Sequence, residues 1–317
     1  MSVNKALRVV VRVVAGAVVG SAAHANTSNG YNLPIGVTDL SKAMYGLHME
    51  VFWICVGIAV VVFGAMIYSL VKFRKSQGAI PDTTMLHSTK VEIIWTIIPV
   101  VILVVMAIPA ADLILKMEDT RNSELSIRVT GYQWKWQYQY MDAAEGVNFF
   151  STLAQDSNFA RELHSGIDPK SVPNYLLEVD KPMVIPSGTK VRLLLTSQDV
   201  IHAWWVPDFG AKRSAIPGFV NELWFNVEPG KEGIYRGQCA ALCGRDHGFM
   251  PIVVDVRTPE AFKQWVEEQK AALKQASAPD MSAPGVPVPA AVPVSAPPPR
   301  SAQVISSESL GAGHQSP

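Results

Sequence analysis

Two long apolar segments limit what this chain can fold into. Val51–Val71 and Ile93–Ala111 contain no charged side chain, in a chain of 317 residues. Each has about the 20 residues that an α-helix needs to cross the ~30 Å hydrocarbon core of a membrane. The sequence therefore predicts two membrane-spanning helices, at about 51–71 and 93–111.

The short segment between the two spans is basic, which predicts the orientation of the hairpin. Lys72, Arg74 and Lys75 follow the first span, and Lys90 precedes the second. Short loops rich in Lys and Arg stay in the cytoplasm. We therefore expect a multi-pass protein of the bacterial inner (cell) membrane, with both termini and the large C-terminal part in the periplasm.

Residues 1–25 predict a secretory signal peptide. Lys5, Arg8 and Arg12 accompany a short apolar run that ends in Ala-His-Ala, the pattern of a cleavable signal. A first transmembrane helix is the alternative, but the run is short and interrupted by arginines. Cleavage after Ala25 is expected, and it predicts the same topology as the basic loop.

Beyond the hairpin the pattern changes to short β-branched or alternating runs separated by Pro-Gly turn signals. Examples are Leu125–Thr130, Lys190–Thr196, Glu222–Val227 and Pro251–Val256. Short strands at this spacing are typical of an antiparallel sandwich or barrel. An amphipathic helix is expected over 259–275.

These patterns divide the chain into four parts. After the signal peptide, 26–119 holds the N-terminal segment and the hairpin, 120–275 the β domain, and 276–317 a Pro/Ala-rich tail. The tail is predicted to be disordered because it has few bulky apolar side chains to bury. Since 27 basic residues balance 27 acidic ones, the charge indicates no nucleic-acid partner.

One loop near the end of the β domain carries metal-binding side chains. Its spacing is Cys239-x3-Cys243-x3-His247-x2-Met250, and a second imidazole is available upstream at His202. A disulfide or a structural zinc site would use the same cysteines. The thioether favours copper, because soft sulfur with imidazole selects that metal. Two cysteines, where a single-copper site needs one, suggest bridging sulfurs and two copper ions.

The hairpin, this loop and the segment around His202 together resemble subunit II of the haem–copper cytochrome c oxidases, over about residues 40–270. The resemblance implies a membrane-anchored all-β protein, in which a two-helix transmembrane hairpin precedes a cupredoxin-like β-sandwich or barrel. It also implies a dinuclear copper centre, CuA. Its ligands would be the bridging Cys239 and Cys243, His202 and His247 with one copper each, the weak ligand Met250, and the backbone carbonyl of Ala241.

The function that this resemblance implies is electron transfer within a respiratory oxidoreductase and translocase. The chain would accept electrons from cytochrome c and pass them to haem in subunit I, which also holds CuB and reduces oxygen to water. Subunit III and membrane lipid would be further partners. One alternative is the quinol-oxidase type of subunit II, which lacks the copper ligands, so the cysteines and histidines argue against it. A periplasmic copper-delivery or assembly protein is the alternative from another class, which the hairpin and the aromatic run below disfavour.

An aromatic run at 131–140 alternates with polar residues. A strand with a buried aromatic face explains this alternation without any function. In the family, however, the tryptophan through which electrons enter matches Trp134. Asp142, Asp180 and Asp199 match acidic positions that would steer a basic cytochrome c to this face, mainly by raising the association rate.

Glu92 lies at the cytoplasmic edge of the second span, close to Trp95. A plain interfacial acid beside an aromatic anchor is one interpretation. The resemblance implies another, in which this glutamate lies at the mouth of a proton-uptake path that belongs to another subunit.

Three positions depart from the family pattern. Ala241 stands where a glutamate is usual, Ser214 where an aspartate is expected, and Phe219 where an arginine is expected. The alanine keeps the backbone carbonyl but loses the carboxylate. Because magnesium requires oxygen ligands, we predict that the magnesium ligand usually provided by this subunit is absent.

Overall fold

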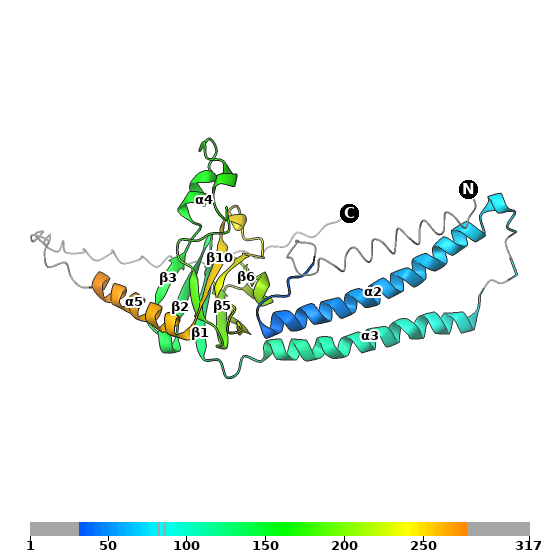
Figure 1. Ribbon diagram of the computed structural model, residues 1–317, viewed down its shortest axis with the longest axis horizontal. Helices are drawn as coiled ribbons and strands as arrows, with labels where there is room; N and C mark the ends of the chain where they lie inside the picture. The colour runs from blue at the N-terminus through cyan, green and yellow to red at the C-terminus, as the bar shows by residue number, and fades with distance from the viewer. Residues whose placement is uncertain (1–31, 81–82, 85–86, 278–317) are drawn as a thin grey trace, which may run out of the picture. The chain divides into compact units, whose positions relative to one another are not determined.

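The structure is a computed structural model that describes residues 32–80, 83–84 and 87–277 (Figure 1). The predicted signal peptide lies outside the described residues, as does nearly all of the predicted disordered tail. The helices are α2 (Asp39–Lys72), α3 (Thr89–Glu118), α4 (Gln155–Ala160) and α5 (Pro259–Ser277). The strands are β1 (Leu125–Tyr132), β2 (Lys135–Tyr140), β3 (Asn148–Ser151), β4 (Met183–Pro186), β5 (Val191–Ser197), β6 (His202–Val206), β7 (Ala211–Ala215), β8 (Asn221–Phe225), β9 (Gly233–Gln238) and β10 (Pro251–Arg257).

Helices α2 and α3 contain the two predicted spans and extend beyond them at both ends. Both are long and apolar enough to cross a membrane, and their most apolar windows have no buried side chain within this chain. Helix α2 begins early because Thr38 caps it. The Thr38 side chain accepts a hydrogen bond from the Ser41 backbone N–H at 3.0 Å, and Ser41 Oγ accepts one from the Thr38 N–H at 3.0 Å. The outward apolar side chains require lipid or a partner protein around them.

The ends of the hairpin are bonded to the β domain. Thr38 Oγ1 donates a hydrogen bond to the Phe209 carbonyl at 2.8 Å. At the end of α3, both guanidinium nitrogens of Arg213 contact the Glu118 carboxylate, at 2.7 and 2.9 Å. Such a two-point contact fixes geometry better than a single ion pair does.

The β domain contains a five-stranded sheet in the order β3-β2-β1-β5-β8, a three-stranded sheet β4-β10-β9 and a β6-β7 ribbon. The expectation of a purely antiparallel sandwich is wrong, because β1 pairs with β5 in parallel and β10 pairs with β4 in parallel. Parallel neighbours need a long crossover connection. The chain between β1 and β5, which includes β2, β3 and β4, provides one.

The core lies between the two larger sheets. Alternate side chains of β5 are buried, among them Leu193 and Leu195, and they form one cluster with Ile252 and Val254 of β10. Helix α5 adds Trp265 to this cluster, as expected for an amphipathic helix. The packed sheets form a stiff scaffold for the connections at their ends.

Both metal-binding segments are attached directly to this scaffold. His202 is the first residue of β6. The loop with the two thiols connects β9 to β10. Strands β6 and β9 approach so closely that a Cβ on Gly237 would lie 2.0 Å from the Trp205 carbonyl oxygen, and the position therefore requires glycine.

Candidate metal centre

Three of the predicted ligands converge on the two thiols. Cys239 Sγ and Cys243 Sγ lie 3.8 Å apart. His202 Nδ1 is 3.9 Å from Cys239 Sγ, and His247 Nδ1 is 3.4 Å from Cys243 Sγ. The Met250 sulfur is 3.5 Å from Cys243 Sγ. Two thiols therefore lie between two imidazoles, and a thioether contacts one of the thiols.

The predicted carbonyl also reaches the site, and the thiols are not joined to each other. The Ala241 carbonyl oxygen lies 3.4 Å from Cys239 Sγ. Both cysteines are free thiols here, whereas a disulfide would bring the sulfurs to about 2.05 Å. The donor atoms of His202, Cys239 and Cys243 lie within 4.8 Å of one another, close enough to share a metal ion.

The His202 ring is oriented by groups that are not ligands. It has no exposed surface, and its Nε2 lies 2.9 Å from Asp199 Oδ1. When Nε2 donates a hydrogen bond to this carboxylate and Nδ1 is deprotonated, the Nδ1 lone pair faces the thiols, which is the usual arrangement behind a metal-bound imidazole. The Trp136 ring packs edge-on at 5.8 Å, and a Cβ on Gly131 would come within 2.7 Å of His202 Cδ2. We call His202 with Asp199, Trp136 and Gly131 the strand flank of the centre.

The His247 ring is presented by a loop. It begins a 3-10 turn, η5 (His247–Phe249), and its backbone N–H donates to the Gly244 carbonyl at 3.3 Å. The side chain is half-buried. Of the residues around it, Asp246 and Phe249 contact Arg161, which lies between β3 and β4. We call His247 with Arg161, Asp246 and Phe249 the loop flank.

The two thiols differ in acidity. Burial raises the pKa of Cys239, but hydrogen bonds from His202 and from the backbone at Ala203 and Ala241 outweigh burial, so its pKa lies below the ordinary thiol value. Burial, followed by the charge on Cys239, raises the pKa of Cys243. Ionisation of Cys239 therefore opposes ionisation of Cys243, and a metal cation would favour the thiolate form of both.

The pKa values of His202 and Asp199, on the strand flank, shift in opposite directions. Burial lowers the pKa of His202, but hydrogen bonds to Cys239 and Asp199 raise it above the ordinary value overall. Burial raises the pKa of Asp199, but hydrogen bonds with His202, Val200 and Gln133 lower it overall. Asp199 is therefore an anion that holds the ring, as an acceptor of its N–H.

Trp134 lies against the loop between β9 and β10 that carries the two thiols (residues 239–250), which we call the metal loop. It occupies the turn between β1 and β2, and its Nε1 donates to the Cys243 carbonyl at 3.2 Å. Gln133 Nε2 donates to the same carbonyl at 2.9 Å. The Arg245 guanidinium carbon is 5.6 Å from the centre of the Trp134 ring. The half-buried indole is thus hydrogen-bonded to the backbone of a thiol ligand.

The three acids predicted to dock a partner are not brought together. Asp199 adjoins Trp134 through the Gln133 backbone N–H, at 2.7 Å. Asp142 lies near the opposite end of the β1–β2 hairpin, where it accepts from the Ser126 N–H at 3.0 Å. Asp180 accepts from the Thr152 N–H at 2.7 Å, on the far side of β3, just past the residue that pairs with Trp136. Their roles in docking stay predictions.

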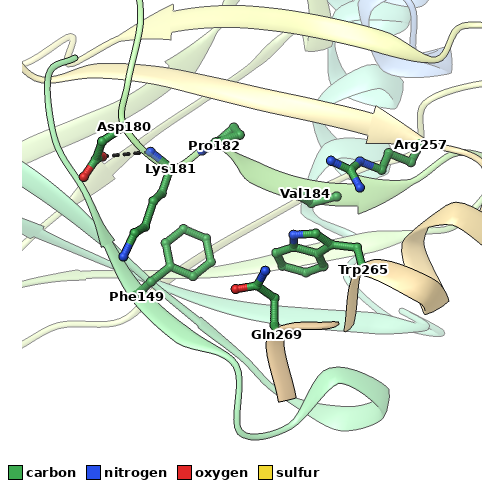
Figure 2. Close-up of a pocket in the computed structure, with 8 residues that line it drawn as sticks. All are labelled: Phe149, Asp180, Lys181, Pro182, Val184, Arg257, Trp265 and Gln269. Carbon is green, nitrogen blue, oxygen red and sulfur yellow. Dashed lines mark hydrogen bonds between the residues drawn. The ribbon is translucent and has the colours of Figure 1, made fainter. Parts of the chain in front are cut away.

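Asp180 also lines a shallow cavity of about 190 Å³ between the β domain and α5 (Figure 2). Figure 2 shows its carboxylate bonded to the Lys181 backbone N–H, while Trp265 and Gln269 of α5 form the other side. None of the predicted metal ligands lines this cavity. The two thiols therefore lie outside this cavity.

The remaining predicted residues are Glu92 and the positions that depart from the family pattern. Glu92 lies in the first turn of α3, where a carboxylate interacts favourably with the helix dipole. Ser214 pairs with Ala203, next to His202 in the chain, whereas Phe219 is exposed. Neither Ala241 nor Ser214 offers a carboxylate to a hard cation.

Together, the two apolar helices, the packed sheets and the sulfur–imidazole cluster define a class: membrane-anchored β-sandwich proteins with a group of side chains that could hold a soft metal ion. Comparisons with known proteins agree with this class. The family described as cytochrome c oxidase subunit II, periplasmic domain, matches residues 125–257, and the family described as its transmembrane domain matches residues 26–113.

Individual relatives point the same way. The "Probable cytochrome c oxidase subunit 2" of Rickettsia bellii is 37% identical over 227 residues, or 72% of this chain and 79% of that protein. Cytochrome c oxidase subunit 2 of Arabidopsis thaliana is 35% identical over 73% of this chain and 86% of its own length. The solved periplasmic domain of subunit II from Bradyrhizobium japonicum is 40% identical, with 48% of this chain and 98% of that chain covered and a TM-score of 0.41.

The chain belongs to the cytochrome c oxidase subunit II family. The resemblance and the fold class predicted from the sequence are thereby confirmed: a membrane hairpin precedes a cupredoxin-like sandwich. Membership makes the chain part of an oxidase complex with other subunits, anchored in a membrane by α2 and α3.

Several residues around the centre were not found from the sequence. Gln133 was missed, Asp199 was interpreted only as a docking acid, and Arg161 was not singled out. The spacing Asp199-x2-His202 was a usable signal, because a carboxylate three residues before an imidazole can accept its second N–H. No local signal points to Arg161, which reaches the metal loop only through the fold.

Proposed function

We propose that this chain is the subunit through which electrons enter the oxidase. It accepts them from cytochrome c at a dinuclear CuA centre and passes them to haem in subunit I, where oxygen is reduced to water. The observation that carries this proposal is the convergence of two free thiols, two imidazoles and a thioether at the β9–β10 loop.

The donor set fits copper better than zinc. Cys239 and Cys243 would bridge the ions, His202 and His247 would bind one each, and Met250 and the Ala241 carbonyl would be weak ligands. Thioether and thiolate are soft ligands suited to copper. When bound, such a centre supplies reversible one-electron transfer. Zinc would use the thiolates and imidazoles but has no use for Met250, which is buried against Cys243.

The chain's own residues limit how far the ligands move. His202 is locked by Asp199, and the carbonyl of Cys243 accepts hydrogen bonds from Gln133 and Trp134. Ligands that stay in place when the charge changes keep the reorganisation energy low, and that is the protein's contribution to electron transfer. A bound metal would displace the protons of both thiols, and the raised pKa of Cys243 would make its proton the harder one to displace.

Trp134 is proposed as the residue where electrons enter. Support comes from its indole, which is only partly buried and donates to the carbonyl of Cys243. An electron on this ring is one hydrogen bond and a few covalent bonds from a sulfur ligand. Asp142, Asp180 and Asp199 remain proposed docking acids, although Asp199 is already engaged with His202.

The remaining assignments follow from the topology predicted for the hairpin. The β domain lies on the periplasmic side of the bacterial inner membrane, and cytochrome c, subunit I and subunit III are the protein partners. Glu92 lies at the mouth of a proton path on the opposite side. The magnesium ligand usually supplied at position 241 is absent.

Copper reconstitution of the full-length chain tests the proposal. The chain is purified in detergent, reduced, loaded with copper, and compared with Cys243→Ser. We expect two copper ions per chain, and an electron paramagnetic resonance spectrum in which one electron is shared equally between them. The serine variant should lose this spectrum. A single exchangeable Cu(I) would instead support a copper-delivery protein.

A further inference from the structure

The connection between β3 and β4 forms a lobe, residues 155–178, that begins with α4 (Figure 1). Its Arg161 side chain contacts the loop that carries the thiols. Arg161 Nη1 lies 3.5 Å from Asp246 Oδ1, and the guanidinium carbon lies 4.3 Å from the centre of the Phe249 ring. The Arg161 Nε donates to Asn158 Oδ1 at 2.7 Å, which fixes the direction of the guanidinium within the lobe.

The two residues that Arg161 touches enclose a proposed ligand. Asp246 immediately precedes His247, and Phe249 ends the 3-10 turn that His247 begins. The Phe249 backbone N–H also donates to the Asp246 carbonyl at 2.9 Å, so the turn is closed on itself. A single planar cation therefore contacts the side chains of Asp246 and Phe249, which flank His247 in the chain.

Burial separates this contact from an ordinary surface ion pair. The Arg161 and Asp246 side chains are 28% and 15% exposed, and Arg161 is also stacked on an aromatic face. Exposed ion pairs contribute little, whereas partly desolvated cation–π contacts contribute more. Asp246 has a second cation at 3.4 Å, Arg245, but that side chain is 82% exposed and weakly constrained.

We propose that Arg161 is a positioning residue for the metal centre. From the β3–β4 lobe, its guanidinium holds Asp246 and Phe249 and so presents the His247 imidazole to Cys243 before metal arrives. This inference rests on the proposed copper function, and it assigns the lobe a part in assembling the centre. It involves no contact between Arg161 and the metal.

The test uses the full-length chain in detergent with Arg161→Gln, which keeps a polar side chain but loses the charge and most of the stacking. In the copper-free chain, amide hydrogen exchange over 244–249 should become roughly ten-fold faster, because the turn loses its outer support. In the loaded chain, copper loss to a chelator should be roughly ten-fold faster, the lower end of the effect of residues that orient ligands. If the imidazole is displaced, the two ions become inequivalent and the copper hyperfine pattern changes.

Three variants control the result. Lys170→Gln removes a positive charge from the same lobe, and Lys170 forms no ion pair within the described part of the chain, so it should match the wild type. Arg161→Lys keeps the charge near Asp246 but not the planar stack, and should restore part of the protection. Asn158→Ala should give a weaker form of the Arg161→Gln effect.

The outcomes are separable from those of the proposed function. In one outcome the wild-type chain holds two coppers, and Arg161→Gln matches Lys170→Gln in amide exchange, copper loss and spectrum. That outcome overturns the positioning role alone. A wild-type chain that holds no copper pair overturns the proposed function and, with it, this inference about a metal ligand. If Arg161→Gln is unfolded by circular dichroism, Arg161→Lys and Asn158→Ala decide, and unchanged exchange in both overturns the proposal.

Discussion

The two imidazoles reach the thiols from supports of different kinds. On the strand flank, His202 is wholly buried at the start of β6 and is held by Asp199 and by close packing against Trp136. On the loop flank, His247 is half-buried in a short turn whose ends are held by Arg161. The strand flank is part of the core, whereas the loop flank depends on one side chain from a neighbouring lobe. His202 is therefore held by the core of the fold, whereas the position of His247 depends on contacts between a short turn and the β3–β4 lobe.

The largest expected effect comes from crowding the strand flank. Gly131→Ala places a methyl group 2.7 Å from His202 Cδ2, so the ring must move. Overpacking of this kind costs about 1–3 kcal/mol in stability, and displacement of the ring should lower copper affinity by roughly 100-fold. Chelator competition measures the affinity. On the loop flank, Gly248→Ala meets nothing within 4 Å and should leave affinity unchanged. Equal effects of the two substitutions would abolish the distinction between the flanks.

A smaller effect is expected when the carboxylates of the two flanks are neutralised separately. Asp199→Asn cannot accept the His202 N–H as an anion, and should lower copper affinity by about 10–100-fold. Asp246→Asn keeps the ring contact between Arg161 and Phe249, and should lower it only several-fold. The same competition assay compares them. An effect of Asp246→Asn that exceeds that of Asp199→Asn would reverse the proposed order of the flanks.

Trp134 belongs to neither flank, and replacing it separates metal retention from electron transfer. Trp134→Phe removes the hydrogen bond to the Cys243 carbonyl while Gln133 keeps its own. Copper content should stay unchanged, while reduction of the assembled oxidase by cytochrome c slows on the order of ten-fold, or about 1.4 kcal/mol in activation free energy. Stopped-flow absorbance follows the reduction. If copper is lost while the chains that keep copper are reduced at the wild-type rate, the indole supports the structure of the metal loop instead.

The smallest effect is expected away from both flanks, at Glu222. The Arg192 guanidinium lowers the pKa of this carboxyl, and its carboxylate also accepts from Thr120 Oγ1 at 2.8 Å. A lowered pKa in the folded state means that the stability it contributes is present above the ordinary glutamate value of 4.5 and is lost as pH falls through the folded pKa. Because the pair is about one-third exposed, Glu222→Gln should cost only about 0.5 kcal/mol at neutral pH and nothing in strong acid. Denaturant titrations at pH 7 and pH 3 check this, and a larger cost at pH 3 contradicts the sign.

Much of this molecule was predictable because its signals are contiguous in the chain. The uncharged runs predict α2 and α3 from length alone, and the Cys-x3-Cys-x3-His-x2-Met spacing identifies a ligand loop that the fold keeps between two strands. The structure brings each of these ligands to the thiols, together with His202, which lies far upstream. Their roles as ligands remain predictions.

The remainder depends on long-range contacts that no local pattern encodes. The parallel pairing of β1 with β5 arises because the crossover through β2, β3 and β4 returns the chain beside β1, and alternation alone does not distinguish that from antiparallel pairing. Asp199 was predicted only as a docking acid, a role that stays a prediction, and its contact with His202 became visible only in the structure. Arg161 is separated from Asp246 by several strands, and only the packed sandwich brings them together.

The most direct test of the account is the number and coupling of metal ions at the two thiols. Full-length chain, reduced and loaded with copper, should bind two ions per chain, and its electron paramagnetic resonance spectrum should be that of one electron shared equally between them. A chain that takes up a single copper, or two with independent spectra, would contradict a centre built on Cys239 and Cys243 as bridging sulfurs.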